Sequence, residues 1–198
     1  MTPLIAKLLH GLCMVAWWVI RRPFERKTKR NVITHDAMDV QEKLLLAVSF
    51  TGLGVIPFIY IVSGFPRSLN QDFSPLRAVL GLMLFVASLG LFYATHKALG
   101  RNWSVTLKVR EEHALVTAGV YRFVRHPMYT AFWMWAIAQA LTLQNWVAGF
   151  AGIVGFGTLY LFRVGREEAL MRATFGADWD AYAARTPRVM PFARRGSK

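Results

Sequence analysis

The stretch that decides the fold is MYTAFWMWAIAQALTLQNWVAGFAGIVGFGTLYLF, residues 128–162. It contains two apolar runs, at 128–143 and 146–162, which are separated only by Gln144 and Asn145. A membrane helix needs about 20 apolar residues to cross about 30 Å of hydrocarbon, so each run is slightly short. We predict that the stretch forms a tight helical hairpin, with one bent helix and a re-entrant segment as the alternative.

Three further apolar runs lie upstream, at 4–20, 44–62 and 78–95. The first ends in tryptophans and arginines rather than in the small residues of a signal-peptide cleavage site, so we expect it to be a retained helix. Together with the hairpin, these runs predict an all-α integral membrane protein of about five transmembrane helices. Residues 1–95 then form an N-terminal region of three helices, and residues 96–198 hold a polar loop, the hairpin and a polar tail.

The charges of the chain are distributed asymmetrically around these runs. The 198 residues are 55% hydrophobic with net charge +13, and the basic residues fall between the apolar runs. A nucleic-acid partner is therefore not expected, because no soluble basic face is formed. Lys and Arg number 21 in segments 21–43, 96–127 and 163–198, against 3 on the opposite side. This asymmetry predicts cytoplasmic loops, a cytoplasmic C-terminus and an outside N-terminus, and it suits a bacterial inner membrane. The basic segments are also expected to contact membrane lipids.

Small residues interrupt two of the runs. Gly52, Gly54 and Pro57 lie inside the second run and predict a kink or close packing there. In the last run, small residues recur at the spacing that lets membrane helices approach closely: Ala148, Ala151, Gly152 and Gly155. The single cysteine, Cys13, excludes an intramolecular disulfide, and the sequence does not indicate an oligomeric state.

The stretch GVYRFVRHPMY, residues 119–129, leads into the hairpin. Pro127 suits the first turn of a helix, and His126 and Tyr129 are three residues apart, so both can lie on one side of the helix start. The free N–H groups and the positive end of the helix dipole make such a start a receptor for a carboxylate or phosphate. The alternative is that both side chains only anchor the helix at the membrane interface.

A second polar cluster, FRVGREEALMRATFGADWDAY, occupies residues 162–182. Arg163 and Glu167 are four residues apart, as are Glu168 and Arg172, so each pair can meet on a helix face. Arg163 and Glu167 lie within a turn of the bilayer, where an unpaired charge costs several kcal/mol, so they are candidate functional residues. No group of His, Cys, Asp and Glu has the spacing of a metal site, and no metal is expected.

Three motifs flank the hairpin: LGRNWS (99–104), HALVTAGVYRFVRHPMY (113–129) and RVGREEALMRATFGADWDAYAARTPRVMP (163–191). In this order they resemble the isoprenylcysteine carboxyl methyltransferase family, which is similar in turn to the membrane phospholipid N-methyltransferases. The resemblance covers residues 99–191. It implies a membrane-embedded methyltransferase that uses S-adenosyl-L-methionine without a Rossmann domain, with residues 96–198 as the catalytic region.

The resemblance also implies roles for particular residues. Arg163 and Glu167 are the implied catalytic residues, and Arg163 is the implied substrate contact. The implied cofactor contacts are His113, Ala114, Leu115, Val116, Tyr121, His126, Pro127, Met128, Tyr129 and Glu167. The chain departs from many relatives at Ala131, where they have glycine, and from some at Thr106, where they have glutamine.

The chemistry of these residues agrees with methyl transfer. The start of the helix, with His126 and Tyr129, suits the cofactor's carboxylate, and Glu167 suits its amine or its sulfonium. Methyl transfer is an in-line displacement that depends on alignment and requires no metal. An acceptor carboxylate is already ionised at neutral pH and can be oriented by Arg163, which favours a lipophilic small molecule or prenylated acid that enters from the bilayer. The alternatives are a lipid amine N-methyltransferase, a membrane reductase on the same scaffold, and a non-enzymatic membrane adaptor.

Overall fold

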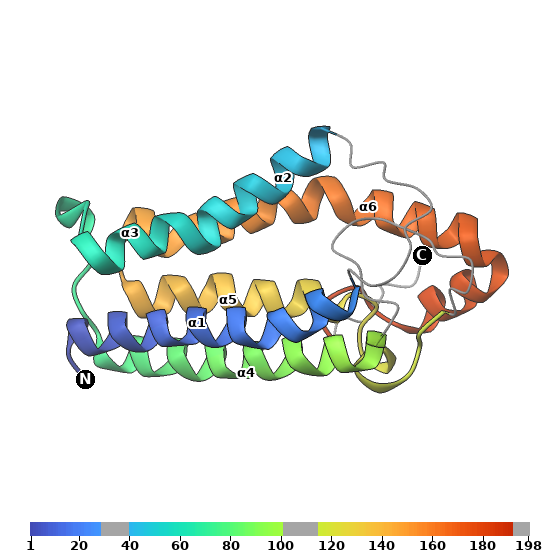
Figure 1. Ribbon diagram of the computed structural model, residues 1–198, viewed down its shortest axis with the longest axis horizontal. Helices are drawn as coiled ribbons and strands as arrows, with labels where there is room; N and C mark the ends of the chain where they lie inside the picture. Colours follow the sequence, from blue (N-terminus) through green and yellow to red (C-terminus); the bar gives the residue numbers. More distant parts are fainter. Residues whose placement is uncertain (29–39, 101–114, 192–198) are drawn as a thin grey trace.

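The computed structural model describes residues 1–28, 40–100 and 115–191, and these parts of the chain are helical with short connections (Figure 1). The helices are α1 (Pro3–Thr28), α2 (Val40–Phe50), α3 (Ile56–Ser63), α4 (Pro75–Leu99), α5 (Pro127–Leu143) and α6 (Trp146–Arg185). Shorter elements are the π-helical turn η1 (Thr51–Val55) and the 3-10 turns η2 (Arg67–Leu69) and η4 (Gly119–Arg122). The predicted all-α architecture is confirmed.

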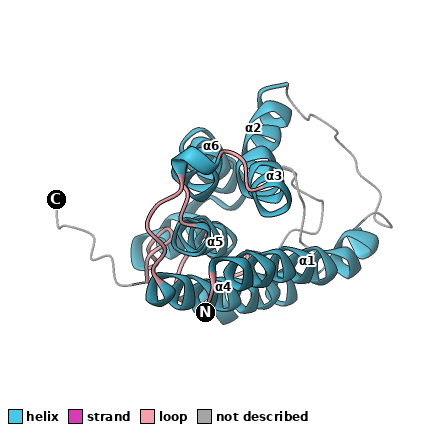
Figure 2. Cartoon of the chain, turned by 90° about the vertical axis from the view of Figure 1, so that its left-hand side faces the viewer, coloured by secondary structure: helices cyan, strands magenta, loops and turns pink. Residues whose placement is uncertain are grey.

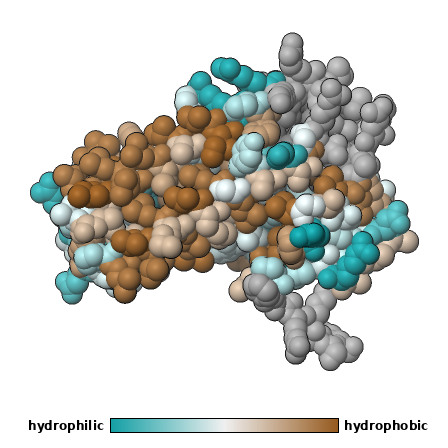
Figure 3. All heavy atoms as spheres, turned by 90° about the horizontal axis from the view of Figure 1, so that it is seen from below, coloured by the Kyte–Doolittle hydropathy of each residue, from teal (hydrophilic) through white to brown (hydrophobic). Residues whose placement is uncertain are grey.

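Four regions of the described chain are long and apolar enough to cross a membrane: Pro3–Arg26, Val40–Ser63, Pro75–Leu99 and Trp146–Arg185. The fifth predicted span is α5, which has 17 residues and is therefore about 25 Å long. It falls short of the length of the other four because it begins at Pro127 and ends at the hairpin turn. On the face seen in Figure 3, apolar residues cover the middle of the molecule, and hydrophilic residues lie toward its two ends. The chain is a multi-pass integral membrane protein.

The helices are arranged in layers around α5. Viewed along the bundle, α5 lies between α4 on one side and α6 on the other, with α1 beside α4 and with α2 and α3 beside α6 (Figure 2). Helix α5 is correspondingly buried, with Ala136, Ala138 and Gln139 each fully inaccessible to solvent. The hairpin of α5 and α6 is therefore the centre of the fold.

The predicted close packing of small residues occurs between the second helical run and α6. A Cβ on Gly52 would overlap the carbonyl oxygen of Ala151, and a Cβ on Gly155 would lie 2.7 Å from the carbonyl oxygen of Val48. Glycine on both sides therefore lets the two backbones touch. The run changes from α2 to α3 through η1, so the predicted irregularity near Gly52 is also confirmed.

The turn between α5 and α6 confirms the hairpin and excludes the bent helix. Gln144 has the left-handed conformation with φ 45°, and the Asn145 side chain accepts hydrogen bonds from the backbone N–H groups of Val147 and Ala148 at 3.0 and 2.9 Å. This is the N-cap arrangement that starts a helix. The Asn145 amide also donates to the backbone carbonyl of Pro66, at 2.9 Å, and thereby joins the turn to the loop after α3.

Helix α6 continues past the apolar run and then changes direction. Gly176 has φ 52° and ψ −125°, which breaks the helix, and residues 177–185 fold back toward the start of α5 (red in Figure 1). Trp179, Tyr182 and Ala183 form a small apolar core there, against which Leu115 packs. The sequence predicted a polar helical cluster over residues 162–182 but not this change of direction.

Candidate functional site

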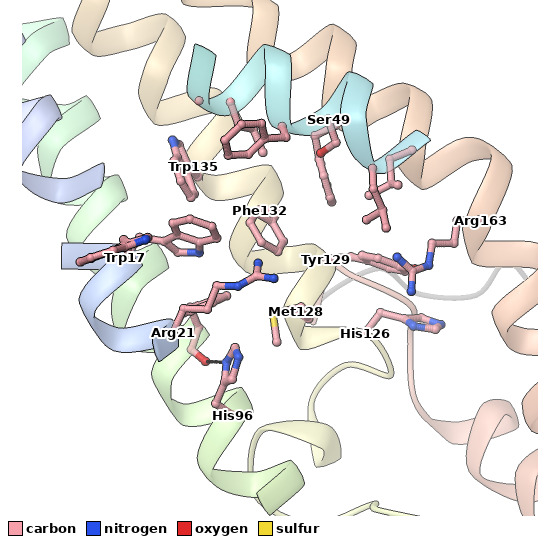
Figure 4. Close-up of a pocket in the computed structure, with 18 of the residues that line it drawn as sticks. Trp17, Arg21, Ser49, His96, His126, Met128, Tyr129, Phe132, Trp135 and Arg163 are labelled. Carbon is pink, nitrogen blue, oxygen red and sulfur yellow. Dashed lines mark hydrogen bonds between the residues drawn. The ribbon is translucent and has the colours of Figure 1, made fainter. Parts of the chain in front are cut away.

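A cavity of about 520 Å³ lies between the helices, on the side of the bundle where α5 begins. One part of its wall is aromatic: Trp17, Phe92, Phe132, Trp135 and Phe156. Another part, the polar wall, comprises His126, Arg163 and Glu167, and two further polar lining residues, Arg21 and His96, lie beside Trp17 and Phe92. In Figure 4, Arg163, Tyr129 and His126 lie together on one side of the pocket, and Trp17 and Trp135 lie on the other. The volume falls within the range of about 300 to 1,000 Å³ that is usual for small-molecule sites.

Three of the predicted site residues, His126, Tyr129 and Glu167, lie together. The Tyr129 hydroxyl donates to Glu167 Oε2 at 2.5 Å, and His126 Nδ1 lies 3.7 Å from Glu167 Oε1. The His126 and Tyr129 rings stack with centroids 5.3 Å apart, as expected for residues on one side of a helix start. The carboxylate that His126 and Tyr129 face in the structure is therefore the side chain of Glu167, which itself lines the cavity.

Glu168, next to Glu167, binds three basic side chains. Arg125 Nη2 and Arg188 Nη2 each donate to it at 2.7 Å, and His126 Nε2 lies 3.2 Å from the same carboxylate. The pair that the sequence spacing predicts, Glu168 with Arg172, does not form. Each partner has a different contact, because the tail returns Arg188 to Glu168 and the fold-back at Gly176 brings Asp180 within 2.7 Å of Arg172.

The end of α6 is tied to the segment just before α5. The backbone N–H groups of Arg125 and His126 donate to the carbonyls of Pro187 and Arg188 at 2.8 and 2.9 Å. The Arg125 guanidinium also donates to the carbonyl of Thr186, at 2.7 Å. Arg125, buried at 5% exposure, therefore has a structural role in holding this corner closed.

The charge of His126 is set by its two acidic neighbours. Burial disfavours the charged imidazole, but the carboxylates of Glu167 and Glu168 outweigh burial and raise the pKa of His126 above its ordinary value of 6.5. The two carboxylates therefore favour the protonated imidazole, whose positive charge holds both of them in place, including the one that faces the cavity.

Arg163 has a partner that the sequence analysis did not identify. Its Nη2 lies 3.3 Å from Glu42 Oε1 in the first turn of α2, and Glu42 is only 4% exposed. The predicted span began at residue 44, so Glu42 was left outside it. The signal was nevertheless present, because an acidic residue within one turn of a long apolar run is an ionisable group at the membrane boundary.

The remaining predicted residues occupy different places. Tyr121 and Met128 line the cavity, whereas Pro127 is buried in the first turn of α5. Leu115 packs against Trp179, Tyr182 and Ala183 rather than on the cavity, and Val116 is half-buried beside it in the chain. Ala131 is 1% exposed where α5 packs on α4, and its carbonyl accepts a hydrogen bond from Ser88 at 2.7 Å. His113, Ala114 and Thr106 lie outside the described residues.

The aromatic wall was not predicted as part of a site. Trp17 is one of the tryptophans near the end of the first apolar run, and it packs against Trp135 with ring centroids 5.1 Å apart inside the bundle. Arg21 and His96 were counted only as charges or polar residues at the ends of helices, but both line the cavity. Nothing in their local sequence distinguishes them from ordinary residues of a membrane interface, since it is the packing of α1 on α4 that brings them together.

The chain is similar to a known protein family and to several of its members. A model of the isoprenylcysteine carboxyl methyltransferase family matches residues 79–173. Protein-S-isoprenylcysteine O-methyltransferase B of Arabidopsis thaliana is 35% identical over 95 residues, which are 47% of this chain and 48% of the relative. A probable protein-S-isoprenylcysteine O-methyltransferase of Oryza sativa subsp. japonica is 26% identical over 166 residues, or 83% of each chain. The human protein-S-isoprenylcysteine O-methyltransferase is 30% identical over 117 residues, or 41% of its own length.

A solved structure supports the fold. The chain is similar to the structure of a eukaryotic intramembrane Ras methyltransferase of the isoprenylcysteine carboxyl type, with a TM-score of 0.55 and 20% sequence identity. The match covers 93% of this chain and 63% of that one. The similarity extends over both the N-terminal helices and the hairpin, whereas the chain spans only about half the length of the Arabidopsis relative.

Proposed function

We propose that the chain is a member of the isoprenylcysteine carboxyl methyltransferase family, whose model matches residues 79–173, and that it is a membrane methyltransferase that uses S-adenosyl-L-methionine. Its proposed acceptor is the carboxylate of a lipidic or isoprenylated compound. One observation carries this proposal: a single cavity of about 520 Å³ is lined by both charged and aromatic side chains. Such a cavity matches one charged cofactor and one acceptor that has an ionised head and an apolar body.

The residues of the polar wall fit the cofactor. When bound, S-adenosyl-L-methionine supplies an electrophilic methyl group on a positively charged sulfur. Glu167 offers a carboxylate to a positive group, either the amine or the sulfonium, and Tyr129 and His126 hold that carboxylate in place. Tyr121, Met128 and Tyr129 add apolar and aromatic surface on the same side of the cavity. We keep His113 and Ala114 as proposed contacts on the basis of the family resemblance alone, together with Leu115, Val116 and Pro127.

Arg163 is the proposed acceptor contact. Its guanidinium lines the cavity beside Tyr129, and a guanidinium orients a carboxylate through charge-assisted hydrogen bonds (Figure 4). A carboxylate is ionised at neutral pH, so the reaction requires orientation rather than a general base. An amine acceptor would have to lose a proton beside this arginine, and this favours O-methylation over N-methylation.

We also propose how the chain is oriented in the membrane and which lining residues each half of the chain supplies. The excess of Lys and Arg in segments 21–43, 96–127 and 163–198 supports a cytoplasmic location for the side where α5 begins, as in a bacterial inner membrane. The cofactor then enters from the cytoplasm and the acceptor from the bilayer. Residues 96–198 supply most of the polar wall, and residues 1–95 supply aromatic wall residues such as Trp17 and Phe92.

The test is the binding of S-adenosylhomocysteine to the detergent-purified protein, measured by calorimetry. We expect wild type to bind and both His126→Ala and Glu167→Ala to weaken binding at least tenfold, which corresponds to about 1.4 kcal/mol or more. Asp180→Asn is the matched control, because it removes an exposed carboxylate on the same helix that contacts Arg172. A folded wild type that shows no binding would refute the proposal.

A further inference from the structure

Glu42 is a buried acidic residue that has no role in the function proposed above. It lies in the first turn of α2, is 4% exposed, and forms an ion pair of 3.3 Å with Arg163. Arg163 lines the cavity, whereas Glu42 is not among the cavity-lining residues of the described chain. The carboxylate of Glu42 therefore contacts the guanidinium without lining the cavity itself.

The ion pair with Arg163 fixes this carboxylate in place. A buried charge that loses its partner costs several kcal/mol, so the two side chains constrain each other strongly. A negative charge in the first turn of a helix is also favoured by the helix dipole. A guanidinium has five N–H donors in a rigid fork, so its contact with Glu42 is compatible with a second carboxylate at the cavity.

Other contacts fix α2 against α6 and so fix Glu42 against Arg163. Arg166, one turn along from Arg163, donates to the side chain of Gln41 at 3.1 Å. Further along the same two helices, the backbones touch where Gly155 meets Val48 and Gly52. The orientation of Arg163 therefore depends on the packing of a helix that precedes the family match, which begins at residue 79.

We propose that Glu42 is a positioning residue for the acceptor. Its carboxylate holds the Arg163 guanidinium in the orientation that receives the acceptor's carboxylate, and it does not touch the cofactor. This inference rests on the proposed carboxyl methyltransferase function, and it adds a residue from the N-terminal half of the chain to the machinery of that function.

The test measures methyl transfer by the full chain to N-acetyl-S-farnesyl-L-cysteine, a prenylated carboxylic acid. Outer residues that orient a metal ligand typically contribute about 10- to 100-fold, and the lower end of that range suits a residue that orients an arginine. We expect Glu42→Gln to lower kcat/KM for this acceptor by about tenfold, chiefly through KM, and to leave the affinity for S-adenosylhomocysteine within about twofold. Glu42→Asp, which keeps the charge, should recover a large part of the loss. Lys43→Gln, at an exposed residue next to Glu42 on α2, is the matched control and should leave KM unchanged.

A double-mutant cycle separates positioning from a general structural role. If Glu42 acts through Arg163, Glu42→Gln should cost less than about threefold in an Arg163→Lys background, because the residue that it positions is already altered. Additive losses, or equal losses in KM and in S-adenosylhomocysteine affinity, would overturn the positioning role while wild-type activity stands. A wild type that neither binds S-adenosylhomocysteine nor methylates the probe would instead refute the proposed function, and this inference with it.

Discussion

The two ends of the α5–α6 hairpin are held by different chemistry. At the turn, neutral amides meet: the Gln144 side chain bonds both the backbone N–H and the carbonyl of Ser74, at 2.7 and 2.9 Å, and Asn145 bonds Asn70 at 2.9 Å. At the opposite end, charges meet: Glu167 and Glu168 of α6 face His126 before α5, and Glu168 binds two arginines. Both ends fix the same pair of helices.

The difference lies in what each end leaves available. Asn145 is fully buried, and its side chain bonds to the helix start and to the neighbouring loop, so it has no polar atom left for a ligand. At the charged end the side chain of Glu167 keeps 26% of its surface exposed and lines the cavity with Arg163. A neutral, satisfied turn contributes stability, whereas oriented charges beside a cavity supply binding and catalysis. Substitutions at the two ends should therefore produce different kinds of loss.

The largest effect is expected for Glu167→Gln at the charged end. Loss of the carboxylate that faces the cavity should weaken cofactor binding by about 10- to 100-fold, since hydrogen bonds to charged groups contribute about 1.5 to 3 kcal/mol. Calorimetry with S-adenosyl-L-methionine and with S-adenosylhomocysteine distinguishes its partner. Equal losses assign the amine, and a larger loss for the sulfonium form assigns the sulfur. Unchanged affinity for both would remove Glu167 from the site.

Arg163→Lys should have the next largest effect. A lysine keeps the charge but cannot form the forked contact, so kcat/KM for a carboxylate acceptor should fall by about 10- to 30-fold. Cofactor affinity should stay within about threefold. Kinetics with labelled cofactor measure both, and Arg172→Lys, which alters an exposed arginine of the same helix, is the control. A fall in cofactor affinity alone would place Arg163 with the cofactor rather than with the acceptor.

Asn145→Ala tests the neutral end. The substitution removes the cap of α6 and two donated hydrogen bonds, so the free energy of unfolding should fall by about 2 kcal/mol. The thermal midpoint in detergent should drop, while S-adenosylhomocysteine affinity of the folded protein stays the same. Thr158→Ala, which removes a hydroxyl bonded only within α6, should leave the midpoint close to that of wild type. If Asn145→Ala instead weakened ligand affinity, the contrast between the two ends would fail.

The smallest effect is the pH dependence that His126 contributes. Its pKa is raised in the folded protein, so its stabilisation is complete below its ordinary pKa of 6.5 and is lost as the pH rises through the folded value. The thermal midpoint of wild type should therefore decline above pH 6.5, and that of His126→Gln should decline less. The groups that face His126 are Glu167, Glu168 and the adjoining Arg125. Parallel profiles for the two proteins would show that His126 is neutral in the folded state.

Much of the fold was determined by the sequence itself, because hydropathy and local spacing act on neighbouring residues. The two runs around Gln144 and Asn145 predicted the hairpin, and Gly52 and Gly155 predicted where helices would touch. Pro127 predicted the start of α5 and placed His126 and Tyr129 on one side of it. Each of these predictions depends on a few consecutive residues or on one helical period, and each is confirmed.

Only the tertiary structure decided which charges meet. The sequence paired Glu168 with Arg172 by local spacing, whereas the fold pairs Glu168 with Arg125 and Arg188, which lie 43 and 20 residues away. It likewise pairs Arg163 with Glu42 from another helix. A buried ion pair forms where the attraction between the two charges best offsets the free energy of removing them from water. Which charges meet in this way depends on which helices the apolar core brings together. Helical period restricts the partners that one helix can offer, but the packing of α2, α5 and the folded-back tail on α6 selects among them.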